Sequence, residues 1–110
     1  MSGPSQQIAL TGAVGVREIA GLAGQLREHL SAPGPLLIDC TGVTEIDLSV
    51  VQVFVAAHKS ARADGRSLAL RAPADGPLCR LLKAAGFLGA DGRPLTPEAE
   101  LWSGAGGKAA

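Results

Sequence analysis

The stretch LLIDCTGVTEIDLSVVQ, residues 36–52, decides the fold that we predict for this chain. Its first three residues, Leu36 to Ile38, form an apolar run that stops at Asp39. Such a run is typical of a central strand that is buried on both faces, so we expect a charge at Leu37 to unfold the domain. Asp39 then marks the carboxyl end of the strand, which is where open α/β sheets place their sites.

The second half of the stretch predicts a helix. A turn at residues 41–42 leads to Asp47, whose carboxylate can accept hydrogen bonds from the first free N–H groups of a helix. Residues 48–63 continue as one helix, and Gly65 suits the left-handed conformation that ends it. We therefore predict a strand, a loop and a helix that returns over the sheet.

Upstream of this stretch, we predict a strand, a turn and a helix. Residues 7–10 alternate polar and apolar and meet a turn at residues 11–12, after which residues 14–16 return as a second strand. The helix starts at Arg17, and residues 33–35, Pro-Gly-Pro, end it. Its apolar stripe consists of Ile19, Leu22, Ala23, Leu26 and Leu30.

Downstream, residues 67–71 alternate again and predict a strand with Leu68 and Leu70 on one face. Residues 75–77 start a third helix, which Gly86 caps. The apolar face of this helix consists of Leu78, Leu81, Leu82 and Ala85. Strands and helices thus alternate along the chain, which predicts the α/β fold class.

The length of the chain bounds its organisation. With 110 residues, of which 46% are apolar, it can bury one hydrophobic core and not two. We expect one domain over residues 8–98, between flexible tails at residues 1–7 and 99–110. We also expect the chain to be a monomer when alone.

Charge and hydropathy argue against two classes of partner. Lys and Arg together number 10, as do Asp and Glu, so no electrostatic term favours nucleic acid or anionic lipid. The apolar stretch at residues 50–57 is far shorter than the roughly 20 residues that span a bilayer. These features predict a cytoplasmic protein without direct membrane insertion.

The residues offer no catalytic set, metal site or cofactor site. Cys40 and Cys79 lack a cysteine or histidine at metal-ligand spacing, which favours buried thiols. Ser49 and His58 are a tempting nucleophile and base, but their separation along one helix puts them ~13 Å apart along its axis. We therefore expect a protein that is not an enzyme and needs no metal or cofactor.

The order of elements resembles the STAS domain family, whose members include the anti-sigma-factor antagonists. In that family a buried strand ends in an acidic or polar residue, and a loop then leads to an apolar residue, an Asp, a Ser or Thr and a helix. Residues 36–52 follow this order, and residues 57–70 and 78–87 follow the family's later order of elements. The resemblance covers about Ile8 to Leu88. It implies a bacterial protein-binding module with a small sheet of about four mixed strands and three to four helices.

The resemblance also implies a phosphorylation switch. Members of the antagonist type dock on a serine kinase or anti-sigma factor, and phosphorylation of a Ser or Thr at the start of this helix releases them. Here Leu48 occupies the usual acceptor position, so Ser49 is the candidate phospho-acceptor, the alternative being a first-turn residue that bonds the backbone. Asp39 and Asp47 match the acidic site residues of the family. Their other interpretations are a solvated strand end and a structural N-cap.

The outer face of the predicted helix offers a docking surface. Its residues Leu48, Gln52, Ala56 and Lys59 recur at helical spacing, and Val51, Phe54 and Val55 then face the sheet. Two functions would use this surface. One is a partner-switching or chemosensory regulator that binds a signalling protein, and the other is an accessory STAS subunit of a bacterial lipid-transport ABC-type assembly that binds a transporter subunit.

Overall fold

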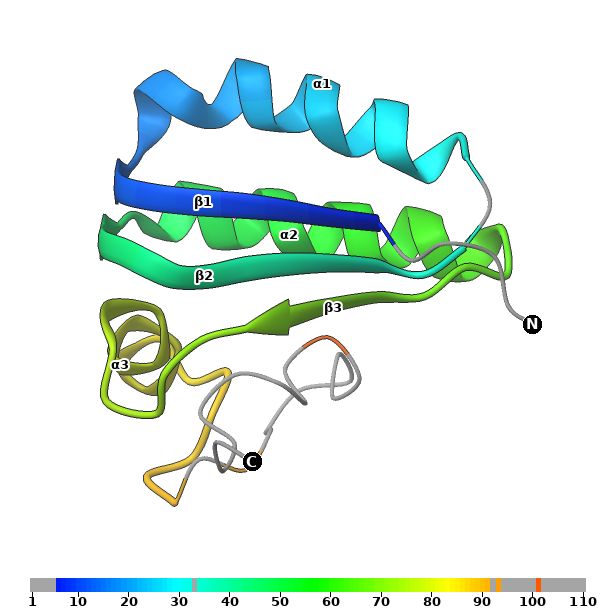
Figure 1. Cartoon of the computed structure of the whole chain (residues 1–110). Coiled ribbons are helices and arrows are strands. Elements are labelled where there is room, and N and C mark those ends of the chain that lie inside the picture. Colours follow the sequence, from blue (N-terminus) through cyan, green and yellow to red (C-terminus); the bar gives the residue numbers. More distant parts are fainter. Residues whose placement is uncertain (1–5, 33, 92, 94–100, 102–110) are drawn as a thin grey trace.

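The computed structural model describes residues 6–32, 34–91, 93 and 101. Its elements follow the chain in the order β1 (Gln6–Val14), η1 (Val16–Glu18), α1 (Ile19–Leu30), β2 (Leu36–Ile46), α2 (Leu48–Ala63), β3 (Leu68–Arg71) and α3 (Pro77–Ala84) (Figure 1). The element η1 is a single turn of 3-10 helix. This alternation of strands and helices confirms the predicted α/β class. None of the described helices has the length and apolar character to cross a membrane.

The sheet differs from the predicted one in strand number and direction. Among the described residues it has three strands in the order β1-β2-β3, and both pairings are parallel. The expected turn at residues 11–12 and the second strand at residues 14–16 are wrong, because β1 runs unbroken to Val14. Gly12 takes a φ of 72° inside β1, a conformation that glycine adopts at little cost. The glycine therefore marks an irregularity within one strand and not a hairpin.

Strand β2 is longer than predicted. It continues past the expected turn at residues 41–42 as far as Ile46, because β1 stays paired with it through two shifts of register. At one shift Gly42 lies opposite Thr11, and a Cβ on Gly42 would come 2.9 Å from Cγ2 of that threonine. Close approach of two strands thus explains this glycine. As a result, Asp39 lies within β2 and not at its carboxyl end.

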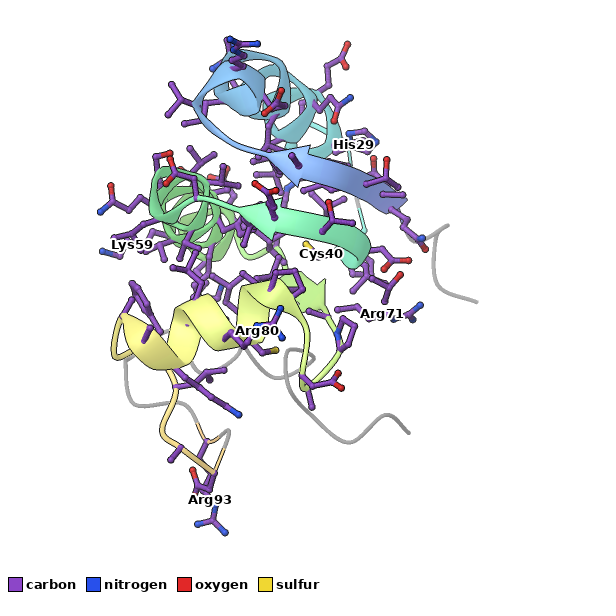
Figure 2. The ribbon with its side chains drawn as sticks, turned by 90° about the vertical axis from the view of Figure 1, so that its left-hand side faces the viewer. His29, Cys40, Lys59, Arg71, Arg80 and Arg93 are labelled. Atoms are coloured by element: carbon purple, nitrogen blue, oxygen red, sulfur yellow. The ribbon has the colours of Figure 1, made fainter. Side chains whose placement is uncertain are left out.

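Helices α1 and α2 cover one face of the sheet (Figures 1 and 2). In β2 the residues on that face are buried, namely Leu36, Ile38 and Cys40, and in β3 they are Leu68 and Leu70, as predicted. Leu37 and Asp39 point to the other face and are half-buried. The expectation that the central strand is buried on both faces is therefore wrong, and Ile38, not Leu37, is the residue at the centre of the core.

The helices agree with the prediction at most of their ends. Helix α2 spans the predicted residues 48–63, and Gly65 after it has a φ of 70°, as a left-handed cap requires. Helix α1 begins at Ile19 and not at Arg17, which lies in η1. The buried face of α3 consists of Leu78, Cys79 and Leu82. Ala85 follows that helix and is exposed, so its predicted place on the buried face is wrong.

Residues near both termini take part in the fold. Strand β1 begins at Gln6, inside the expected N-terminal tail of residues 1–7. Leu101, inside the expected tail of residues 99–110, is fully buried and belongs to the core. The other residues of both expected tails, apart from Gln7 in β1, lie outside the described residues.

Candidate partner-docking site

The site lies where β1 and β2 end side by side. Val14 and Ile46 are paired in the sheet, and the backbone N–H of Asp47 donates a hydrogen bond to the Val14 carbonyl oxygen at 3.2 Å. The ends of these two strands and the chain segments that follow them line an open hollow of about 570 Å³. Its lining residues are Ala13, Val14, Gly15, Val16, Arg17, Glu18, Glu45, Ile46 and Asp47.

Two exposed apolar side chains flank this hollow. Val16 is 69% exposed and Leu48 is 38% exposed, and no other large apolar side chain of the described residues is exposed. Val16 lines the hollow, and Leu48 directly follows the lining residue Asp47 at the start of α2. Both large exposed apolar groups therefore lie at the same end of the sheet.

The start of α2 departs from the predicted capping geometry. Asp47 does occupy the N-cap position, but its carboxylate accepts no hydrogen bond from the N–H groups of the helix. Oδ2 of Asp47 instead accepts a hydrogen bond of 2.7 Å from the Ser49 hydroxyl, while its backbone carbonyl accepts one of 3.0 Å from the Val50 N–H. The nearby hydroxyl competes with the backbone for the carboxylate. Asp47 thus orients the half-buried Ser49 side chain.

The outward stripe of α2 is confirmed as a surface. Its four residues, Leu48, Gln52, Ala56 and Lys59, are all exposed. Val51 and Phe54 on the opposite side are fully buried, and Val55 is partly buried against the core. Figure 2 shows the Lys59 side chain pointing away from the sheet. Asp47, Leu48 and Ser49 therefore lie together at the start of α2, and the exposed stripe continues from there along the helix as far as Lys59.

Asp39 does not belong to that region. It points to the face of the sheet opposite α1 and α2 and is paired in register with Arg71 of β3. Its Oδ1 accepts hydrogen bonds from the Thr41 backbone N–H at 3.0 Å and from the Thr41 hydroxyl at 2.7 Å. These two hydrogen bonds from Thr41, helped by the charge of Arg71, lower the pKa of the Asp39 carboxyl from its ordinary value. The Asp39 side chain is thus bound to Thr41 of its own strand and lies apart from the docking region.

His58 lies in the core and does not approach Ser49. Its side chain is 2% exposed, and neither ring nitrogen has a hydrogen-bond partner among the described residues. Cys40 and Cys79 are buried thiols, as predicted. Burial, followed by the nearby Asp39 carboxylate, raises the pKa of Cys40 to about 12, so this thiol stays protonated and unreactive near neutral pH.

Sequence reasoning missed the residues that lie before α1. Val16, Arg17 and Glu18 form η1, in which the Glu18 carboxylate accepts a hydrogen bond of 2.6 Å from the Gly15 N–H. Val16 was predicted to lie in a returning strand, so its exposure was not expected. If the parallel pairing of β1 with β2 had been predicted, the site would have been found, because parallel strands end at the same edge of a sheet.

The fold and site define a small α/β module in which helices return over one face of a parallel sheet and the start of α2 is exposed. The protein-family model described as Mlab, STAS domain matches residues 1–96, and the chain therefore belongs to the STAS domain family. The resemblance seen in the sequence is confirmed. STAS domains are generally non-catalytic regulatory modules. A search of curated proteins found no match.

Proposed function

We propose that this STAS module docks a protein partner and acts as a partner-switching regulator, of the anti-sigma-factor-antagonist or chemosensory type. Its docking face consists of Val16, Leu48, Gln52, Ala56 and Lys59. The observation that carries the proposal is the position of Val16 and Leu48, the two exposed large apolar side chains of the described residues, at one end of the sheet. The module is a monomer when alone and binds one signalling protein, such as a serine kinase.

The composition of this face suits a protein interface. Complete burial of a Val or Leu side chain contributes about 1.5–3 kcal/mol relative to full exposure, and each of these two has exposed area left to bury. Gln52 and Lys59 add exposed polar groups further along α2, as in the polar rim of a typical interface. The hollow next to Val16 can receive a projecting side chain of the partner.

Ser49 is the residue through which we propose that phosphorylation switches docking. Its hydroxyl lies 2.7 Å from the Asp47 carboxylate, so a phosphate there would lose this hydrogen bond and face a like charge. The N-terminal end of α2 attracts an anion while it is in water. In a complex, however, roughly two added charges beside Asp47 must be desolvated, which weakens binding.

The test is the affinity of three variants for the partner that a pull-down recovers. Leu48→Asp should abolish binding, because it places a charge on the apolar part of the docking face. Ser49→Asp should weaken binding at least tenfold, while Ser49→Ala should bind like the wild type. Gln25→Asp, which adds the same charge at an exposed position of α1, is the matched control and should leave affinity unchanged. Circular dichroism of each variant verifies that it is folded.

Two outcomes would contradict parts of this proposal. If Leu48→Asp abolishes binding while both Ser49 variants bind like the wild type, docking stands and the phosphorylation switch fails. If none of the three variants changes the affinity, then α2 is not the docking surface.

A second candidate function is a constitutive accessory subunit of a bacterial lipid-transport ABC-type assembly. The observation that favours it is Leu48, an apolar residue at the position where the family's antagonists carry their phospho-acceptor. A transporter subunit as the recovered partner, together with unaltered binding of both Ser49 variants, would select this function. A kinase or anti-sigma factor as the partner would select the first.

A further inference from the structure

We propose that the hollow at the end of β1 and β2 binds a basic side chain, Arg or Lys, of the partner protein, with apolar partner residues beside it against Val16 and Leu48. This inference rests on the proposed docking function and specifies the chemistry of the partner. It concerns residues that sequence analysis did not assign to any site, namely Val16, Arg17, Glu18 and Glu45.

The charges around the hollow support a basic occupant. Three of its lining residues are acidic, namely Glu18, Glu45 and Asp47, and one, Arg17, is basic. The chain as a whole has a formal net charge of zero, so this negative excess is local. A partner that removes water from the hollow would leave these carboxylates costly to desolvate unless it supplies positive charge.

The hydrogen bonds of the lining show which carboxylate is available. One oxygen of Glu18 already accepts the Gly15 N–H, and one oxygen of Asp47 accepts the Ser49 hydroxyl. The carboxylate of Glu45, which is exposed, makes no hydrogen bond to another described residue. Glu45 therefore has its full capacity for a partner cation, and the second oxygen of Asp47 can add to it.

The apolar side chains beside the hollow restrict further which kind of partner segment can bind there. Val16 lies within the lining of the hollow and Leu48 lies just outside it, on the side of α2. A partner segment that carries a basic residue next to apolar residues would pair its charge with the acidic residues of the hollow. Its apolar residues would cover Val16 and Leu48. One partner cation is already offset by the carboxylates of the hollow, so no positive charge is left to neutralise a phosphate on Ser49. A basic partner side chain in the hollow is therefore compatible with release of the partner by phosphorylation.

The test uses a displayed library of random peptides, selected against the wild-type chain. Peptides that bind should carry Arg or Lys next to apolar residues, and in amide NMR spectra they should shift the signals of residues 15–18 and 45–49. The double variant Glu45→Gln with Asp47→Asn removes two charges at nearly constant shape, and the new amide oxygen can still accept the Ser49 hydroxyl. It should bind these peptides about tenfold more weakly at low ionic strength, with the difference shrinking as salt is added.

Glu28→Gln, which neutralises an exposed carboxylate on α1, is the matched control and should bind as the wild type does. Suppose that the selected peptides shift the same signals but lack basic residues, or bind the double variant equally well. The basic partner chemistry is then wrong, while the docking function stands. If no peptide is enriched, or if every enriched peptide shifts other signals, the inference and the docking function fail together.

Discussion

His58 occupies an environment that suits an apolar side chain better than an imidazole. It is 2% exposed, and its ring nitrogens lack hydrogen-bond partners among the described residues. Its position on α2, beside Phe54 and Ala61 on the buried face, explains the burial, and the apolar surroundings explain the missing partners. A buried polar group without partners destabilises the folded state.

Replacement of this imidazole by an apolar side chain should therefore stabilise the protein. We expect His58→Leu to raise the free energy of unfolding by about 1–3 kcal/mol, because it removes the desolvation penalty at similar volume. Urea denaturation at pH 7 measures the difference. His29→Leu, at a half-buried position of α1, is the control, with an expected change below about 0.5 kcal/mol. A less stable His58→Leu protein would contradict the inference that the ring is unpartnered.

Asp39 should give the protein an acid-dependent contribution to stability. Its carboxyl pKa is lowered in the folded state by the backbone and hydroxyl hydrogen bonds from Thr41, so the stabilisation is present above the ordinary pKa of 3.8. It is lost as the pH falls through the lower pKa of the folded state. Asp39→Asn should thus be less stable than the wild type at pH 6, and the gap should narrow below pH 3.8. Denaturation curves between pH 6 and 2 test this, and a gap that widens in acid would contradict it.

At the scale of elements, β2 shows how one strand divides the molecule into two faces. Ile38 is fully buried under the helices, whereas its neighbour Leu37 is half-buried on the other face. The apolar run at residues 36–38 hid this alternation, because a strand with three successive apolar residues has the same pattern whether one or both of its faces are covered. Burial of the second face depends on elements that the run itself does not encode.

The two faces predict different outcomes for the same substitution. Ile38→Asp should unfold the domain, since an unpaired charge in the core costs much of a total stability of about 5–15 kcal/mol. Leu37→Asp should remain folded, because water reaches that face of β2. Dispersed amide NMR signals for Leu37→Asp and collapsed signals for Ile38→Asp are the expected pair of spectra. Unfolding of both variants would mean that the second face is covered as well.

Two glycines, one after α2 and one within α1, test the backbone conformations of the helices. Gly65 has a φ of 70° after α2, a conformation that disfavours a Cβ, so Gly65→Ala should destabilise the protein by about 1 kcal/mol. Gly21 lies exposed within α1, and a Cβ there would meet no atom within 4 Å. Gly21→Ala should stabilise the protein by about 0.5–1 kcal/mol. The midpoints of thermal unfolding of the two variants should shift in opposite directions from that of the wild type. A shift of both midpoints in the same direction would show that one of the two backbone conformations is wrong.

For the whole molecule, the sequence predicted the helices better than the sheet. The ends of α2 follow from local signals, Asp47 before it and Gly65 after it, and its outward stripe follows from helical spacing. The number and direction of the strands could not be predicted in this way, because β1 and β2 pair across a long separation in the chain. Gly12 and Gly42 gave turn signals locally, although Gly12 takes its positive φ inside β1 and Gly42 permits the close approach of β2 to Thr11 of β1.

The residues of the candidate site show the same difference between what local signals predict and what long-range strand pairing decides. Ser49 and the four residues of the α2 stripe were predicted because one helix carries them all. Val16 and Glu45 were missed because only the parallel pairing of β1 with β2 brings the ends of these strands together. Asp39 was placed at this end because its strand was expected to stop there, and the longer β2 moves it away.

The central claim is that the end of β1 and β2 and the outer face of α2 together bind a protein partner. Amide hydrogen exchange of the chain alone, compared with the chain bound to its recovered partner, tests it most directly. Binding should slow exchange at residues 15–18 and 47–59 and leave β3 and residues 7–11 of β1 unchanged. Slower exchange confined to those strands, with none at the start of α2, would place the partner on the uncovered face of the sheet and contradict the claim.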